Sequence, residues 1–307
     1  YEILRCLVGS EMCIRDRYNM STDFDVIIPV SEKDILIVKR NIIYIGKNIN
    51  PSCIYLIMNK AFHHYYSMKF CVKNKVVVLD ESQLIEGLNY SHVALLKGSS
   101  AGWYLQQFIK MGFSLSKYAK RYYLIWDADT IPLRPISFFN ETSLFFTPKT
   151  EYYEPYFVTI KKLLGLSKLV DYSFIAENML IDSNIMRDLI ETISKSDVFG
   201  ESWYDKVLNA TNDGGDFSEF ETYGTFVMAK YPGTYRKRTL NTFREAGYID
   251  GRCLKDRLMQ KMAKDYDTIS LELYHKPLFP RNILCIALRC WVLVLAKSLL
   301  LIQKLES

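Results

Sequence analysis

Two aspartates that follow an apolar run are the residues of this sequence best suited to chemistry. Residues 122–126 read YYLIW, which is typical of a buried strand. Asp127 and Asp129 follow at once, and Pro132 marks the turn out of the strand. Side chains two residues apart in an extended segment point to the same side, so the two carboxylates repel each other unless a cation or proton lies between them. The pair predicts a divalent metal site at the carboxyl end of a strand, where open α/β sheets bind ligands.

Two further Asp-x-Asp pairs stand in a different context. Asp23 and Asp25, like Asp265 and Asp267, come before their apolar runs rather than after them. Turns and solvated caps are expected at such positions. Only the middle pair ends a strand, and we interpret it as the metal or phosphate site.

The elements around this pair alternate between strands and helices. Apolar or β-branched runs predict strands, and apolar residues spaced i, i+3, i+4 predict helices. We expect strands near residues 25–30, 53–58, 75–79, 122–126, 143–147, 178–182 and 269–274. We expect helices near residues 35–45, 99–115, 151–166, 184–194 and 203–209. The alternation predicts an α/β fold with a mostly parallel open sheet flanked by helices, in a single domain over residues 19–280.

The two ends of the chain differ from this domain. Residues 1–18 have no periodic apolar face and resemble translated sequencing-adapter read-through, so we exclude them from the fold. Residues 281–307 predict a C-terminal amphipathic helix in which Arg289, Lys297 and Lys304 share one side of an apolar segment. A basic stripe of this kind favours a helix lying in the membrane interface on anionic lipid. A helix packed in the core and a spanning helix are the alternatives.

The composition limits the class of protein. The net charge of +5 is mild and no block of like charge suggests nucleic-acid binding. The seven cysteines form no C-x-x-C pair, and discounting Cys6 and Cys13 leaves an odd number. These cysteines fit neither a disulfide framework nor a zinc site. The composition favours a protein of the reducing cytoplasm.

Three landmarks in this order resemble a family. They are Gly-Trp-Tyr-Leu-Gln-Gln at 102–107, Trp-Asp-Ala-Asp-Thr at 126–130 and Ser-Glu-x-Glu-x-Tyr-Gly at 218–224. Together they resemble the nucleotide-sugar-dependent glycosyltransferases of the GT-A fold, and more closely a group of bacterial members, over about residues 24–280. The sequence departs from that group at Glu177 and Asn178, where a His-rich pair is expected.

The resemblance implies a donor site and a metal. Mn²⁺ or Mg²⁺ would bridge the acidic pair and the donor diphosphate, with Asp129 as the direct ligand and Asp127 contacting the ribose or a metal-bound water. A late histidine, His275, is the expected third ligand. The residues expected to bind the nucleotide sugar are Val30, Ser31, Asp80, Lys97, Asp127 and Lys276.

The resemblance also implies an acceptor site. Glu219 and Glu221 are the candidates for the general base or for an acceptor clamp, with a solvated turn as the alternative. Tyr223 and Gly224 are expected to line the acceptor side. The implied function is transfer of a sugar to a glycan or lipid-linked acceptor, as in bacterial polysaccharide biosynthesis. The predicted location is the cytoplasm, peripheral on the inner face of the cell membrane.

Two other functions fit parts of the sequence. A phosphohydrolase of the haloacid-dehalogenase type also has Asp-x-Asp after an apolar strand, with Asp127 as nucleophile. Its remaining motifs would be LFFT at 144–147, Lys149 and the pair Asp213 and Asp216. A carbohydrate-binding or assembly protein that keeps the fold without the chemistry is the non-catalytic alternative.

Overall fold

The computed structural model describes residues 23–140, 143–212, 214–276 and 278. Its contacts form two compact units, the first containing the chain up to Ala128 together with Pro135–Leu240, and the second containing Asp129–Arg134 and the chain from Asn241. The segments 1–18 and 281–307, for which we predicted an artefact and an amphipathic helix, lie outside the described residues. Among the residues that the structure describes, no helix has the length and apolar character needed to cross a membrane.

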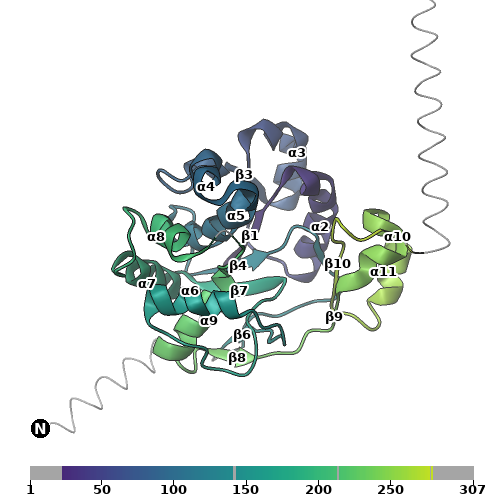
Figure 1. Cartoon of the computed structure of the whole chain (residues 1–307). Coiled ribbons are helices and arrows are strands. Elements are labelled where there is room, and N and C mark those ends of the chain that lie inside the picture. The colour runs from purple at the N-terminus through teal and green to yellow at the C-terminus, as the bar shows by residue number, and fades with distance from the viewer. Residues whose placement is uncertain (1–22, 141–142, 213, 277, 279–307) are drawn as a thin grey trace, which may run out of the picture. The chain divides into compact units, whose positions relative to one another are not determined.

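A five-stranded sheet forms the centre of the first unit. Its strand order is β3 (Val76–Asp80), β2 (Ile54–Met58), β1 (Phe24–Pro29), β4 (Tyr122–Trp126) and β7 (Asn178–Asp182). The four strands from β3 to β4 are parallel, and β7 runs antiparallel to β4. The predicted α/β fold with a mostly parallel sheet is confirmed. Figure 1 shows the sheet among its helices.

Strands β1, β4 and β7 of this sheet are buried along their whole length. The side chains of Val26, Ile27 and Ile28 in β1 and of Leu124 and Ile125 in β4 are inaccessible to solvent. Such continuous apolar runs are typical of parallel strands with two covered faces. The register pairs Phe24 with Tyr122, which brings the carboxyl ends of β1 and β4 to one edge.

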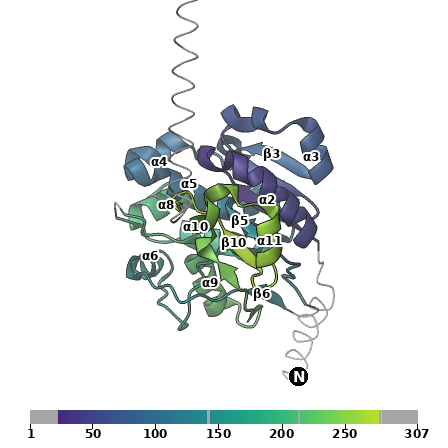
Figure 2. The same ribbon diagram turned by 90° about the vertical axis from the view of Figure 1, so that its right-hand side faces the viewer.

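Helices follow most strands of the first unit. They are α2 (Ile35–Asn48), α3 (Met68–Asn74), α4 (Tyr90–Lys97), α5 (Ala101–Gly112), α6 (Glu154–Leu164), α7 (Ser183–Ser194), α8 (Trp203–Ala210) and α9 (Glu219–Lys230). The short helix α3 packs beside the edge strand β3 (Figure 2). A separate two-stranded sheet pairs β6 (Leu144–Phe146) with β8 (Tyr235–Lys237). We did not predict α3, α4 or the full length of α9.

The expectation of a solvated cap is wrong for Asp25. This residue lies within β1 and is completely buried. Lys120 compensates its charge, with Nζ 3.0 Å from Asp25 Oδ1 and 3.0 Å from Asp23 Oδ2. A buried carboxylate needs such a partner, so this pair is a structural ion pair at the amino end of the sheet.

The second unit contains a three-stranded sheet. Strand β10 (Thr268–Ser270) pairs antiparallel with β5 (Thr130–Pro132) and parallel with β9 (Thr242–Phe243). Two short helices, α10 (Gly247–Asp250) and α11 (Asp256–Met262), complete it. The predicted strand over 269–274 is shorter than expected, because the chain turns at residues 273–274.

Candidate active site

One face of α5 holds the segment that leads into α9. Tyr104 and Gln107 are three residues apart on this helix, and Lys110 is three further, so the three side chains share a face. The Tyr104 hydroxyl donates to the carbonyl of Gly214 at 2.6 Å and accepts from the amide of Asp216 at 3.3 Å. Gln107 Oε1 accepts from the backbone amide of Glu219 at 3.2 Å. The first landmark of the sequence, at 102–107, therefore contacts the third one, at 218–224, directly.

Lys110 joins the second landmark to the third. Its ammonium lies 3.0 Å from Asp127 Oδ1 and 2.9 Å from Glu219 Oε1. The contact with Asp127 is a hydrogen bond, whereas the one with Glu219 is an ion pair without hydrogen-bond alignment. The side chains of Lys110 and Glu219 are 5% and 3% exposed, and that of Asp127 is 31% exposed. The charged groups thus run from the buried Glu219 to the partly accessible Asp127.

The charges in this cluster are mutually dependent. Burial alone would lower the pKa of Lys110, but the carboxylates of Asp127 and Glu219 outweigh it and raise that pKa, so the side chain stays an ammonium. Burial raises the pKa of Glu219, and the charge of Lys110 opposes part of this effect. A buried carboxylate with a raised pKa is a better proton acceptor than an exposed one, as a general base requires.

The backbone around Asp127 is held by three elements. Strand β4 ends at Trp126, and the amide of Asp127 then donates to the carbonyl of Glu177 at 3.0 Å. Asn41 of α2 donates to the carbonyl of Ala128 at 3.1 Å. Glu177 itself is buried and ion-paired with Lys149 at 3.1 Å. These contacts fix the direction in which Asp127 leaves the sheet.

A cleft with a volume of about 670 Å³ opens at the carboxyl ends of β1 and β2. Val30 and Ser31, which we predicted to bind the nucleotide, line it, and so does Trp103 of α5. Asp80 caps the turn after β3 by accepting from the amide of Ser82 at 3.1 Å. Helix α5 borders the cleft through Trp103 and Gln106 and contributes Lys110 to the charged cluster.

Lys97 is placed away from solvent. It is buried at the end of α4 and donates to the carbonyls of Thr211 at 3.0 Å and Asn212 at 2.8 Å. Lys97 thereby holds the beginning of the segment 211–219 in place. Tyr104 and Gln107 hold later residues of the same segment. Its predicted contact with a diphosphate stays a prediction.

Asp129 and His275 belong to the second unit. The carbonyl of Asp129 accepts from the amide of Leu271 at 3.0 Å. His275 is buried, and its ring centroid lies 4.2 Å from that of Tyr248. His275 Nδ1 is buried and has no hydrogen-bond partner among the described residues. Lys276 is exposed. Within residues 23–278 as described, no three His, Cys, Asp or Glu side chains are grouped as a metal site.

The two glutamates of the third landmark have different surroundings. Both are buried in the first turn of α9, so the alternative of a solvated turn is wrong. Glu221 Oε1 accepts from the hydroxyl of Ser173 and from the amide of Phe174 at 3.0 Å. Glu221 therefore anchors the segment before β7, whereas Glu219 contacts Lys110.

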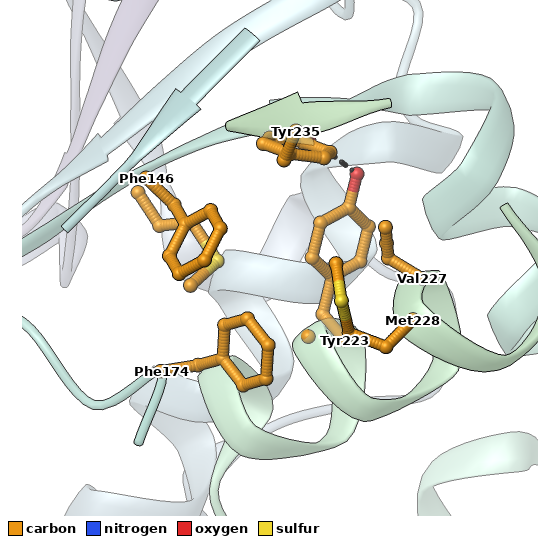
Figure 3. A pocket seen from close by; sticks show the side chains of 8 residues that line it. Phe146, Phe174, Tyr223, Val227, Met228 and Tyr235 are labelled. Atoms are coloured by element: carbon orange, nitrogen blue, oxygen red, sulfur yellow. Dashed lines mark hydrogen bonds between the residues drawn. The ribbon is translucent and has the colours of Figure 1, made fainter. Parts of the chain in front are cut away.

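Tyr223 and Gly224 lie in the core rather than on an acceptor surface. Figure 3 shows the hydroxyl of Tyr223 pointing to Tyr235, at 2.8 Å between the two oxygens. Tyr223 also accepts from the amide of Asp182 at 3.0 Å. The apolar cavity that Tyr223 and Gly224 line has a volume of about 10 Å³, which holds no more than a water molecule. Our expectation for these two residues is corrected accordingly.

Lys110 is the residue that sequence reasoning missed. Its neighbours on α5, Phe108, Ile109 and Met111, are buried and apolar. A single lysine on the apolar face of a helix requires a charged partner. That signal was readable in the sequence.

Comparisons with known proteins complete the description. A family model described as a family of unknown function (DUF6492) matches residues 53–255. A search of curated proteins found no match. Among solved structures, mouse xyloside xylosyltransferase 1 is similar, with 10% identity, a TM-score of 0.41 and coverage of 83% of this chain and 98% of that chain. The galactosyltransferase LgtC with donor and acceptor sugar analogs is similar at 12% identity, with a TM-score of 0.37 and coverage of 80% and 86%. The bifunctional glycosyltransferase WbbM is similar at 14% identity, with a TM-score of 0.38 and coverage of 82% and 46%.

Proposed function

The chain belongs to this family of unknown function, DUF6492, and we propose that it transfers a sugar from a nucleoside-diphosphate sugar to a glycan or lipid-linked acceptor. The observation that carries this proposal is the position of Lys110 between Asp127 and Glu219. One helix thereby connects the acidic strand end to a buried carboxylate and also borders a cleft large enough for a nucleotide.

The donor is assigned to the cleft and the strand ends. Val30 and Ser31 at the end of β1 would contact the base and ribose, and Asp80 lies at the end of β3. Asp127, Asp129 and His275 are the proposed metal ligands, with Lys276 on a phosphate. When bound, Mn²⁺ or Mg²⁺ would offset the charge that develops on the leaving diphosphate. The buried Nδ1 of His275, which has no hydrogen-bond partner among the described residues, supports this assignment.

Glu219 is proposed to take the proton of the acceptor hydroxyl or to orient that hydroxyl. Its burial and raised pKa suit a proton acceptor, and Lys110 keeps the carboxylate oriented. Glu221 has the supporting role, since its Oε1 is occupied by Ser173 and Phe174. The pair therefore divides into one reacting and one positioning glutamate.

The phosphohydrolase alternative gains no support from the sheet. Its second motif should end a strand beside the one that carries the nucleophile. LFFT at 144–147 instead coincides with β6, which pairs with β8 in a separate two-stranded sheet, whereas β4 pairs with β1 and β7. A transferase is the better reading of the same acidic pair.

Attachment to the inner face of a membrane is a further part of the proposal. Residues 281–307 carry the apolar and basic pattern described above. Leu273, Tyr274 and Leu278, shortly before this tail, are each more than half exposed. Exposed apolar residues beside a basic apolar segment suit a lipid surface. A lipid-linked acceptor would be reached from there.

A donor screen tests the proposed activity. The full chain is incubated with a panel of nucleoside-diphosphate sugars and Mn²⁺ or Mg²⁺, and release of the nucleoside diphosphate is measured. We expect one donor to be consumed, EDTA to stop the reaction and added metal to restore it. Phosphate-ester hydrolysis with a beryllium fluoride adduct on Asp127 would establish the phosphohydrolase instead. Binding of a glycan without turnover of any donor would establish the non-catalytic alternative.

A further inference from the structure

An aromatic pair with one exposed ring stands at the beginning of α6. Tyr153 directly precedes the helix and Tyr156 lies in its first turn. Their ring centroids are 4.9 Å apart at an interplanar angle of 70°. Tyr153 is 45% exposed, so one part of its ring is open to a ligand. An accessible ring held by a second ring is a suitable platform for the apolar face of a sugar.

The aromatic pair lies within electrostatic reach of the segment that α5 holds. Burial raises the pKa of Tyr156 to about 12, and the charges of Glu219, Glu151 and Asp216 act in the same direction. Burial likewise raises the pKa of Tyr104, and Asp216 and Tyr153 contribute to it. Helix α6, which carries Tyr156, also packs against α9, whose first turn carries Glu219. The platform therefore belongs to the same region as Glu219.

The carboxylate of Asp216 accepts no hydrogen bond from the part of the chain that the structure describes. The residue is 6% exposed, and its backbone amide is fixed by the Tyr104 hydroxyl at 3.3 Å. A carboxylate that is nearly buried and unpaired is costly unless a ligand supplies the donors. Sugar hydroxyls are donors of this kind.

We propose that Tyr153, Tyr156 and Asp216 form the acceptor subsite and that the acceptor presents an uncharged hexopyranose there. The sugar ring stacks on Tyr153, and its hydroxyls donate to Asp216 and, at the reacting position, to Glu219. This subsite rests on the proposed sugar transfer. No residue of the donor cleft takes part in it.

The charge of the subsite selects the class of acceptor. Asp216 and Glu219 are acidic, and Glu219 shares its charge with the cation of Lys110. That cation is itself shared with Asp127. A uronic acid or a phosphorylated sugar would meet repulsion, which is a means of rejecting the wrong partner. The hydroxyls of an uncharged sugar meet no such repulsion, because they can donate hydrogen bonds to the carboxylates.

Saturation-transfer NMR on the full chain tests the subsite without any donor. The probes are the uncharged methyl glycosides of glucose, galactose, mannose and N-acetylglucosamine, with methyl glucuronide as the anionic probe. We expect at least one uncharged glycoside to bind and the glucuronide to bind much more weakly. Tyr153→Ala should weaken binding roughly tenfold, whereas Tyr153→Phe keeps the ring and the binding.

Two matched variants complete the test. Tyr152→Ala is the control, because the neighbouring Tyr152 is also exposed but stacks on Phe157, 5.5 Å between centroids, outside the subsite. Asp216→Asn should raise the binding of methyl glucuronide relative to the uncharged probe. The inference is overturned if no uncharged glycoside binds, if Tyr153→Ala leaves binding unchanged, or if the wild type prefers the glucuronide.

Failure of the subsite and failure of the proposed function are distinguishable by donor hydrolysis, which needs no acceptor. If the wild type hydrolyses the donor and Tyr153→Ala loses the glycoside, both proposals hold. If the wild type turns over no donor but binds the glycoside through Tyr153, the subsite stands and the transferase activity falls. If the donor is hydrolysed and Tyr153→Ala changes nothing, the subsite falls alone.

Discussion

The ammonium of Lys110 lies 2.9 Å from the carboxylate of Glu219, and both side chains are almost fully buried. This pair is the link between two segments that are far apart in the sequence. Helix α5 contributes the cation and the first turn of α9 contributes the anion. Because Lys110 also contacts Asp127, the proposed base and the acidic strand end are electrostatically coupled.

Removal of Lys110 should destabilise the fold strongly. Lys110→Met leaves the buried Glu219 without its counter-charge, and breaking a buried pair from one side costs about 3–5 kcal/mol. Urea denaturation measures this loss. Lys110→Met combined with Glu219→Gln should recover part of it, because the uncompensated charge is then gone. A Lys110→Met protein as stable as the wild type would contradict the role of the pair.

The two glutamates should respond differently to the same substitution. Glu219→Gln keeps the shape but cannot accept a proton, so we expect transfer to fall by roughly 10²–10⁴-fold while donor binding persists. Glu221→Gln should lower the melting temperature, since Glu221 anchors Ser173 and Phe174. Kinetics and thermal melts of both variants decide the assignment. Equal transfer by Glu219→Gln and the wild type would exclude Glu219 as the base.

The local sequence pattern was sufficient to predict the strands that carry the site. The run at 122–126 and the aspartate after it predicted both β4 and the emergence of Asp127. The helix at 219–230 was not predicted in full, because Gly224 and aromatic residues obscure its period. The ion pair between Lys110 and Glu219 could not be predicted from spacing, since these residues are more than one hundred positions apart. Burial of Asp25 was missed because a cap and a strand residue look alike until the cation from Lys120 is seen.

Metal-dependent nucleotide binding should depend on Asp129. Asp129→Asn removes one negative oxygen ligand from the proposed site, and hard cations bind through such oxygens. Calorimetry with a nucleoside diphosphate and Mn²⁺ should show loss of most metal-dependent binding, with a thermal melt close to the wild type. Asp265→Asn is a suitable control, because it alters an Asp-x-Asp pair that does not end a strand. Full metal-dependent binding by Asp129→Asn would refute the assignment.

The tail should be sufficient for reversible membrane attachment. Each basic residue near an anionic surface contributes about 1 kcal/mol, and residues 283–302 add apolar burial. Removal of residues 281–307 should move the protein to the supernatant and leave its melting temperature unchanged. Alkaline carbonate should release the intact protein. Retention after carbonate would indicate a spanning segment, and aggregation of the shortened chain would indicate a tail packed in the core.

Stability should depend on pH through Asp205, which caps α8. Burial raises the pKa of Asp205, but hydrogen bonds from Ser202 and His92 outweigh it and lower that pKa below its ordinary value of 3.8. A lowered pKa in the folded state contributes stability above the unfolded value, and this contribution is lost as the pH falls through the folded value. Asp205→Asn should therefore cost about 1 kcal/mol at pH 7.

The cost of Asp205→Asn should shrink as the pH falls below the ordinary pKa of 3.8 and then through the lower pKa of the folded state, because the wild-type carboxyl becomes protonated. Urea denaturation at several pH values gives the comparison. Asp197→Asn is the control, because Asp197 is exposed and lies outside the capping box of Ser202 and Asp205. A cost that is independent of pH would contradict this prediction. It would mean that Asp205 stabilises the helix through its shape rather than through its charge.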